Sequence, residues 1–355
     1  MLPNPPVASR RLALGLAVLA ALVIAVPAAV RLVATASDGD GIRLGASGPA
    51  RMPASWPGLA VQDVAVERCC GLPAGTVRVG IVTPVTTPRA DLLFFHGHSD
   101  RMDNHQGLFT AWREESVRVI AFDLPDHGGT AAGSLDTWDL DQLVVLAGRI
   151  EERTRTDRDR PLFLGGFSVG GELAYHAAVH PQLLARFGRR PAGLVLLSPA
   201  LAVQPVTAGD GISKPRALTH PGGASLAPPS PAVPLANPLF ATGLLVQGWQ
   251  DRALTPPRDL PLFVATGDAA QDTYIDVPRI RQWAVRLAGD DVQVDAIGCP
   301  GARHAIDNEA WPVGPDVLAA AGAYLDGVLS ARPRPVPLTA CQPYEHAYLQ
   351  PGATR

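Results

Sequence analysis

The stretch PLFLGGFSVGGELAYHAAV, residues 161–179, carries the strongest structural signal in this chain. It opens on a short apolar run at 162–164, passes through a cluster of glycines around Ser168, and continues into a predicted helix at 171–179. A Gly-x-Ser-x-Gly pattern between a strand and a helix is typical of a nucleophile elbow, a sharp turn that exposes a serine hydroxyl above a sheet. Ser168 is therefore the predicted nucleophile.

The remainder of the chain repeats this alternation of short apolar runs and helical patterns. The segment 137–155 has apolar residues at helical spacing, and 315–329 is predicted as a closing helix. The predicted strands cover 77–82, 92–95, 117–122, 162–164, 194–197, 262–265 and 292–297. Strands that alternate with helices predict an α/β fold with a mostly parallel central sheet and helices on both faces.

Changes in composition suggest where the domain begins and ends. Residues 61–331 are predicted to form the α/β domain, preceded by a Gly-, Ala-, Pro- and Ser-rich linker at 37–60. A Pro-rich tail follows at 332–355. Prolines also break the alternation at 202–258, and an irregular insertion of this length inside a compact domain is usually a cap or lid.

An apolar segment lies close to the N-terminus. Residues 12–30 carry no charge and are long enough, as a helix, to span a hydrocarbon core of about 30 Å. Arg10 and Arg11 precede the segment, which favours export of everything that follows it. We expect residues 1–36 to contain a retained membrane anchor with the α/β domain extracytoplasmic. The alternative is a signal peptide cleaved near 34–36, which would give a secreted protein.

Charge and cysteine content limit the classes of protein. The net charge of −3 provides no basic field to hold nucleic acid. The four cysteines can pair after export, and we expect Cys341 to pair with Cys299 or with one of the adjacent Cys69 and Cys70. Free buried thiols are the alternative. No histidine stands at a zinc-site spacing from these cysteines, so no metal is expected.

A serine nucleophile needs a base and an acid that orients the base. His304 is the candidate base, because it follows the last predicted strand and a short loop. The acid is expected in the loop after the strand at 262–265, where Asp272 is favoured, Asp268 is the alternative and Asp276 is a third candidate. In each case the chain order is Ser, Asp, His, as in α/β-hydrolases.

The reaction also needs backbone donors for an oxyanion. One is expected to be the amide of Val169, directly after the nucleophile. The other is expected from the loop after the strand at 92–95, with the amide of His98 as the donor. His96 is predicted to position this loop, and a role of His98 as a second base stays open.

Four blocks of sequence now carry a family resemblance. The chain resembles α/β-hydrolases of the serine aminopeptidase S33 type, the group that contains monoacylglycerol lipases and lysophospholipases. The matching blocks lie, in order, at 95–98 (FHGH), 123–130 (DLPDHGGT), 166–170 (GFSVG) and 303–309 (RHAIDNE). Asp126 replaces a usual glycine and Ala305 a usual glutamate. Asp272 with Asp276 reproduces the family spacing of two acids, but Gly267 lies two residues too far back, so Asp268 stays open.

The resemblance covers roughly residues 65–330 and implies a function. It implies a serine hydrolase that cleaves carboxylic esters, and lipid esters in particular, without a cofactor. The expected partners are a small-molecule or lipid ester and, through the N-terminal helix, a membrane. A peptidase, a thioesterase or an acyltransferase could use the same residues. A non-catalytic α/β-hydrolase-like binding protein of the cell envelope is the alternative from another class.

Overall fold

The computed structural model describes residues 41–53, 56, 58–204, 218–228, 237–332 and 334–344. The segment 1–36, predicted as an anchor or signal peptide, lies outside these ranges. Among the helices that are described, none is both long enough and apolar enough to traverse a bilayer. The structure therefore bears on the predicted α/β domain.

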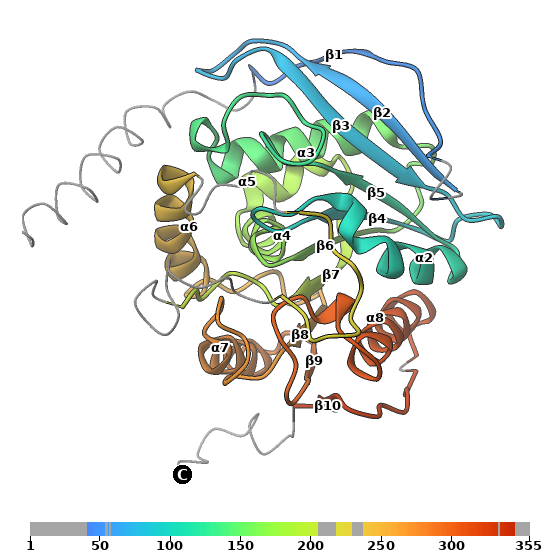
Figure 1. The fold of residues 1–355 in the computed structure, drawn as a ribbon, viewed down its shortest axis with the longest axis vertical. Helices are drawn as coiled ribbons and strands as arrows, with labels where there is room; N and C mark the ends of the chain where they lie inside the picture. Colours follow the sequence, from blue (N-terminus) through green and yellow to red (C-terminus); the bar gives the residue numbers. More distant parts are fainter. Residues whose placement is uncertain are drawn as a thin grey trace, which may run out of the picture.

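A ten-stranded sheet forms the centre of the described chain, in the order β1-β2-β3-β5-β4-β6-β7-β8-β9-β10 (Figure 1). The pairs from β5 to β9 are all parallel, whereas β1, β2, β3 and β10 join antiparallel at the two edges. The strands are β1 (Leu44–Ser47), β2 (Leu59–Val66), β3 (Gly75–Val82), β4 (Ala90–Phe95), β5 (Val117–Phe122), β6 (Leu162–Phe167), β7 (Pro191–Leu197), β8 (Leu262–Thr266), β9 (Val294–Gly298) and β10 (Gln342–Pro343). The predicted mostly parallel sheet is confirmed.

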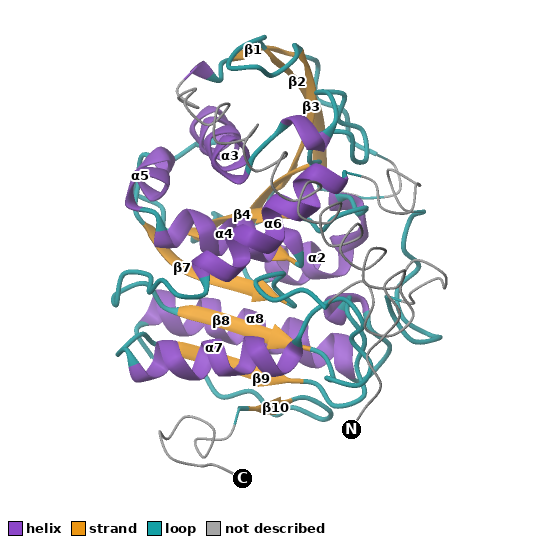
Figure 2. Ribbon diagram, turned by 90° about the vertical axis from the view of Figure 1, so that its left-hand side faces the viewer, coloured by secondary structure: helices purple, strands orange, loops and turns teal. Residues whose placement is uncertain are grey.

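Helices cover both faces of this sheet (Figures 1 and 2). One face carries α2 (Gln106–Glu114) and α8 (Val313–Ser330), and the other carries α3 (Leu140–Thr154), α4 (Val169–Val179) and α7 (Val277–Gly289). The shorter or peripheral helices are η2 (Met102–His105), η3 (Leu135–Thr137), α5 (Pro181–Leu184), η4 (Ala185–Phe187), α6 (Pro238–Asp251) and η5 (Ile306–Asn308).

The sequence pattern explains why two separate cores form. Along β4, successive side chains point to opposite faces of the sheet. Leu93 and Phe95 lie in the core beneath α3, α4 and α7, and Leu92 and Phe94 lie in the core beneath α2 and α8. All four are fully buried, as expected for a central parallel strand that is covered on both sides.

Helix α3 begins later than the predicted 137–155 because of a local capping signal. Asp139 accepts a hydrogen bond from the amide of Gln142 at 2.7 Å, and the Gln142 side chain accepts one from the amide of Asp139. This reciprocal capping box satisfies amides at the first turn of the helix. The helix therefore starts at Leu140.

The predicted linker at 37–60 is partly wrong. Within it, β1 pairs with β2, and β2 itself starts at Leu59, so the sheet extends upstream of the predicted domain start at 61. Small residues such as Gly45 and Ala46 in β1 hid this edge strand, because a short and half-exposed strand needs little apolar side chain.

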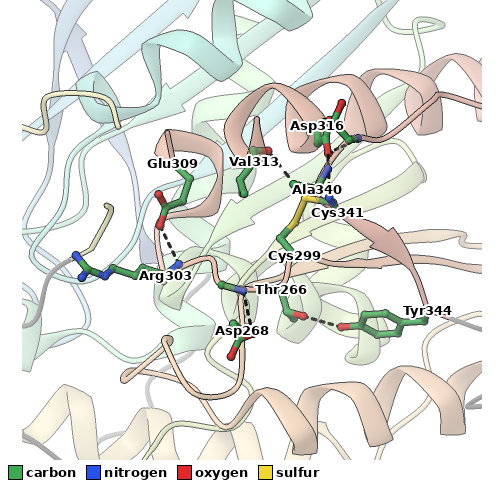
Figure 3. Close-up of a disulfide and its surroundings, with 12 residues drawn as sticks. Thr266, Asp268, Cys299, Arg303, Glu309, Val313, Asp316, Ala340, Cys341 and Tyr344 are labelled. Atoms are coloured by element: carbon green, nitrogen blue, oxygen red, sulfur yellow. Dashed lines mark hydrogen bonds between the residues drawn. A yellow bond between two sulfur atoms is a disulfide. The ribbon is translucent and has the colours of Figure 1, made fainter. Parts of the chain in front are cut away.

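The predicted tail at 332–355 is likewise joined to the domain over part of its length. Cys299, just after β9, forms a disulfide with Cys341, and β10 pairs with β9 directly afterwards (Figure 3). The Asp316 carboxylate of α8 also accepts hydrogen bonds from three consecutive amides that end at Cys341. Of the pairings expected for Cys341, the structure therefore has the one with Cys299.

The predicted cap, 202–258, contains α6 and irregular segments, while 205–217 and 229–236 lie outside the described residues. Helix α6 runs beside α4 in both ribbon views (Figures 1 and 2). Its Phe240 and Leu244 are buried in the core beneath α3 and α4. This part of the cap is therefore packed on the α/β domain.

Candidate active site

Ser168 stands at the junction of β6 and α4 in a backbone conformation that side chains seldom adopt. Its φ is 54° and its ψ is −118°. The turn is possible because its neighbours are glycines: a Cβ at Gly166 would lie 2.2 Å from the carbonyl carbon of Gly170, and one at Gly170 would lie 2.0 Å from the oxygen of Phe95. These contacts explain the Gly-x-Ser-x-Gly pattern and place the serine hydroxyl above the sheet.

The structure brings Ser168, His304 and Asp272 into one chain of hydrogen bonds. His304 Nε2 lies 2.9 Å from Ser168 Oγ, and His304 Nδ1 lies 2.9 Å from Asp272 Oδ2. The second oxygen of Asp272 accepts hydrogen bonds from the amides of Tyr274 and Ile275, and the carboxylate is fully buried. The two amides therefore hold the Asp272 carboxylate in place through Oδ1, while Oδ2 contacts the imidazole.

Two aromatic rings hold the His304 imidazole, and sequence reasoning missed both. Tyr274 stacks on it with ring centroids 4.7 Å apart and an interplanar angle of 22°, and Phe167 lies tilted at 4.9 Å. Phe167 directly precedes the nucleophile and Tyr274 follows the acid by two residues. Their nearness in sequence to Ser168 and Asp272 was the one signal that could have indicated a role at the site. No sequence pattern shows that the two rings face the imidazole.

The other two candidate acids, Asp268 and Asp276, accept hydrogen bonds from backbone amides. Asp268 accepts hydrogen bonds from the amides of Gly301 and Ala270, which lower the pKa of its carboxyl. It thereby ties the β8 loop to the loop that precedes His304. Asp276 is the N-cap of α7 and accepts a hydrogen bond from the amide of Arg279. Of the three aspartates, Asp272 is the one that forms a hydrogen bond with His304.

The loop predicted to supply an oxyanion donor lies directly against the nucleophile. A Cβ at Gly97 would lie 3.2 Å from Ser168 Cβ, so any other residue at this position would crowd the serine. His98 follows it, and its side chain Nε2 lies 3.1 Å from Asn237 Oδ1 at the start of α6. Val169 is the first residue of α4, where a helical amide has no partner within its own helix.

Two histidines, His96 and His127, hold this loop in place through hydrogen bonds to backbone groups. His96 Nδ1 donates to the oxygen of Gly97, and His96 Nε2 accepts a hydrogen bond from the amide of Leu124 after β5. His127 Nε2 accepts one from the amide of Ser99. The structure therefore places His96 where it can position the loop, and burial lowers the pKa of its imidazole to about 4, which keeps it neutral.

A third histidine connects the same loop to the loop of His304, and the sequence analysis did not single it out. His105 in η2 lies 2.9 Å from Asp100 Oδ2 and 2.7 Å from Asp307 Oδ2. Asp100 Oδ2 also accepts a hydrogen bond from the amide of Gly97. Asp307 belongs to the RHAIDNE block, so the two loops on either side of Ser168 share one buried network.

Comparison with known proteins supports what this geometry indicates. A model of the serine aminopeptidase S33 family matches residues 86–243. An uncharacterized abhydrolase domain-containing protein of Dictyostelium discoideum is 29% identical over 119 residues, which are 34% of this chain and 12% of that protein. The aligned part thus spans only a small fraction of that relative.

Solved structures show the same fold at low identity. A lipase in its open form is 20% identical with a TM-score of 0.56, covering 72% of this chain and 95% of that one. A soluble variant of monoglyceride lipase from Saccharomyces cerevisiae, in complex with a substrate analog, is 16% identical with a TM-score of 0.57, covering 76% of this chain and 96% of that one.

The solved structures show that the chain has the α/β-hydrolase fold, and the S33 family model matches residues 86–243, which are less than half of the chain.

Proposed function

We propose that this protein hydrolyses carboxylic esters with Ser168 as nucleophile, His304 as general base and Asp272 as the acid that orients His304. The observation that carries the proposal is the unbroken hydrogen-bond chain from Ser168 Oγ through both nitrogens of His304 to Asp272. This is the arrangement that activates a serine for acyl transfer, whatever fold presents it.

The chemistry balances in two steps. Ser168 Oγ attacks the carbonyl carbon of the ester while its proton passes to His304 Nε2, and the tetrahedral intermediate expels the alcohol, which takes that proton. Water then attacks the acyl-serine, gives a proton to His304, and the free acid leaves as the proton returns to Ser168. The Asp272 carboxylate stabilises the imidazolium that forms in each step.

The oxyanion of each intermediate would be held by backbone amides. Val169 donates from the first turn of α4, where the helix dipole also favours negative charge. His98 donates from the loop that Gly97 brings against Ser168. Side-chain contacts of His96 and His127 hold that loop, so the donors are set before substrate arrives.

We further propose that the substrate is a lipid ester, presented to the extracytoplasmic domain of a membrane-anchored protein. The support is an exposed apolar face on α6, the cap helix that lies beside α4. The large apolar side chains exposed on this helix are Leu239, Leu245, Val246 and Trp249. Such a face next to the site suits an acyl chain or a lipid surface better than water.

The catalytic proposal is tested by covalent labelling of the full-length protein in a mild detergent. A fluorophosphonate probe should label the wild type and the matched control Ser330→Ala, whose serine is exposed at the end of α8, but not Ser168→Ala. Ester turnover by Ser168→Ala should fall by about 10⁴-fold or more. A folded wild-type sample that takes no label would overturn the proposal.

The lipid part is tested separately with p-nitrophenyl esters from acetate to palmitate and with monoacylglycerol dispersed in detergent. A rise of kcat/KM with chain length would support it. A preference for acetate, combined with normal labelling of Ser168, would support the proposed esterase activity and contradict the proposed lipid substrate.

A further inference from the structure

Helix α4 carries a second group of polar side chains at the end remote from Ser168. His176 lies in the last turn of α4, His180 directly follows this helix with an extended backbone, and Asp251 is the last residue of α6, the cap helix packed beside α4. One ligand atom from each of the three residues lies within 4.8 Å of the other two. Neither the family resemblance nor the proposed chemistry uses these residues.

The two nitrogens of His176 face different carboxylates. Nδ1 lies 2.7 Å from Asp251 Oδ2, inside the group, and Nε2 lies 2.7 Å from Asp141 Oδ1 on α3. Without an ion, both nitrogens carry a hydrogen that they donate to these carboxylates. An ion at Nδ1 would replace the hydrogen donated to Asp251, while the N–H donated to Asp141 keeps the imidazole in position. This is the arrangement that orients histidine ligands in metal sites.

The other two residues are also held in place. Asp251 is fully buried, and its Oδ1 accepts a hydrogen bond from Gln247 Nε2 at 2.8 Å while lying 3.0 Å from His180 Nε2. His180 retains 24% of its side-chain exposure, so the group opens to solvent on one side. An ion can therefore reach the three ligand atoms without displacement of a helix.

An unpaired buried carboxyl group lies in the same helix contact. Glu172 stands one turn before His176 on α4, is fully buried, and neither of its side-chain oxygens has a hydrogen-bond partner among the described residues. It faces α6, because a Cβ at Gly248 would lie 3.0 Å from Glu172 Oε1. Burial and the nearby charge of Asp251 raise the pKa of Glu172 well above its usual value. The raised pKa favours the uncharged carboxyl, and a cation beside Asp251 would favour its ionised form.

We propose that His176 Nδ1, His180 Nε2 and the Asp251 carboxylate bind a divalent transition-metal ion, best matched by Zn²⁺, that joins α6 to α4. Two imidazoles and one carboxylate are a common zinc donor set, and water completes the coordination on the open side. Ligand atoms around a tetrahedral zinc ion lie about 3.4 Å apart. The 2.7 Å contact between His176 and Asp251 would thus open by under about 1 Å when the ion binds.

The ion would act on structure and not on the ester. Ser168 and His176 lie about 12 Å apart along the axis of α4, at 1.5 Å per residue. Asp251 is the sole member of the group that comes from the cap, so binding would fasten the end of α6 to the helix that carries the nucleophile. The sequence predicted no metal site, because no histidine stands at a zinc-site spacing from a cysteine. His176 and His180 are four residues apart in sequence, and the structure brings them together at the end of α4.

The test uses the full-length, tag-free protein in detergent after removal of bound metal with a chelator. Titration with ZnCl₂ against a chromophoric chelator should show one Zn²⁺ per chain with Kd below about 1 µM. His180→Gln and Asp251→Asn should weaken binding by at least about 100-fold, and Asp141→Asn by about 10-fold. The matched control is His220→Gln, which removes another partly exposed histidine that is paired with a carboxylate, Glu309. It should bind as the wild type does.

Wild-type protein that binds no stoichiometric Zn²⁺ would overturn the proposal, as would equal weakening by the His220 control. Co²⁺ tests the ligands without any variant, in case Asp251→Asn fails to fold. Intense visible bands of a tetrahedral Co²⁺ complex support the site, and a weak octahedral spectrum rejects it. Both readouts are independent of ester hydrolysis, so their failure would leave the catalytic proposal untouched.

Discussion

Two buried histidines contact the ring of Phe167, and they differ in the hydrogen-bond partners of their imidazoles. The Phe167 ring centroid is 4.9 Å from that of His304 and 5.4 Å from that of His105. His304 contacts one carboxylate and one hydroxyl, whereas His105 contacts two carboxylates, those of Asp100 and Asp307.

The number of carboxylates decides what each imidazole can do. Burial alone would lower the pKa of His105, but attraction to Asp307 and Asp100 outweighs it and raises the pKa to about 10. A histidine that stays protonated cannot accept a proton at neutral pH, so it can only hold loops together. His304 has a nitrogen that faces a hydroxyl, which leaves it able to act as a base.

The largest expected effect is a loss of activity when Asp272, the carboxylate that contacts His304, is replaced. Asp272→Asn should leave the fold intact and lower kcat by about 10⁴-fold, because the amide no longer holds the imidazole in the productive tautomer. Asp268→Asn is the matched control, since Asp268 contacts backbone amides of the same loops without a hydrogen bond to His304. Steady-state kinetics on a p-nitrophenyl ester measures both.

The opposite result, an inactive Asp268→Asn and an active Asp272→Asn, would show that Asp268 and not Asp272 is the acid. Far-UV circular dichroism of both variants should match the wild type, so that lost activity reports on chemistry and not on folding.

The second prediction concerns the His105 side. His105→Gln should lower the free energy of unfolding at pH 7 by about 3–5 kcal/mol, because it leaves two carboxylates, Asp100 and Asp307, without their cation. Urea denaturation measures this loss. Activity should fall less than in Asp272→Asn, since His105 acts through the loops that it joins.

A double variant sharpens this prediction. In the double variant His105→Gln with Asp307→Asn, Asp100 is the one buried carboxylate of the pair that is left without its cation. This variant should therefore be more stable than His105→Gln alone. Equal or lower stability of the double variant would show that the pairing of His105 with Asp307 is not what stabilises the two loops.

The contrast also shows what sequence can and cannot predict. The elbow at Ser168 and the proposed base at His304 are both marked by local sequence pattern. The turn needs its glycines, and the proposed base follows the last parallel strand. Asp272 was one of three aspartates in one loop. Only the path of that loop in space brings it, and not Asp268, to His304.

His105 had no local signal of this kind. Its two partners come from different parts of the chain, with Asp307 lying 202 residues away in sequence. The β1 edge strand and the β10 pairing escaped prediction for a related reason, because short strands at a sheet edge depend on the partner strand more than on their own residues.

The smallest expected effect involves His96, a buried histidine with no carboxylate within hydrogen-bond distance, Asp123 being 3.9 Å away. Its folded pKa of about 4 lies below the unfolded value of about 6.5, so between these values the unfolded chain binds more protons. Stability should therefore fall as pH drops from about 6.5 to 4, by up to about 3 kcal/mol. His96→Gln can still accept the hydrogen bond from the amide of Leu124 but does not titrate. Its unfolding free energy should depend less steeply on pH in this window, and identical slopes would show that His96 is not held neutral by burial.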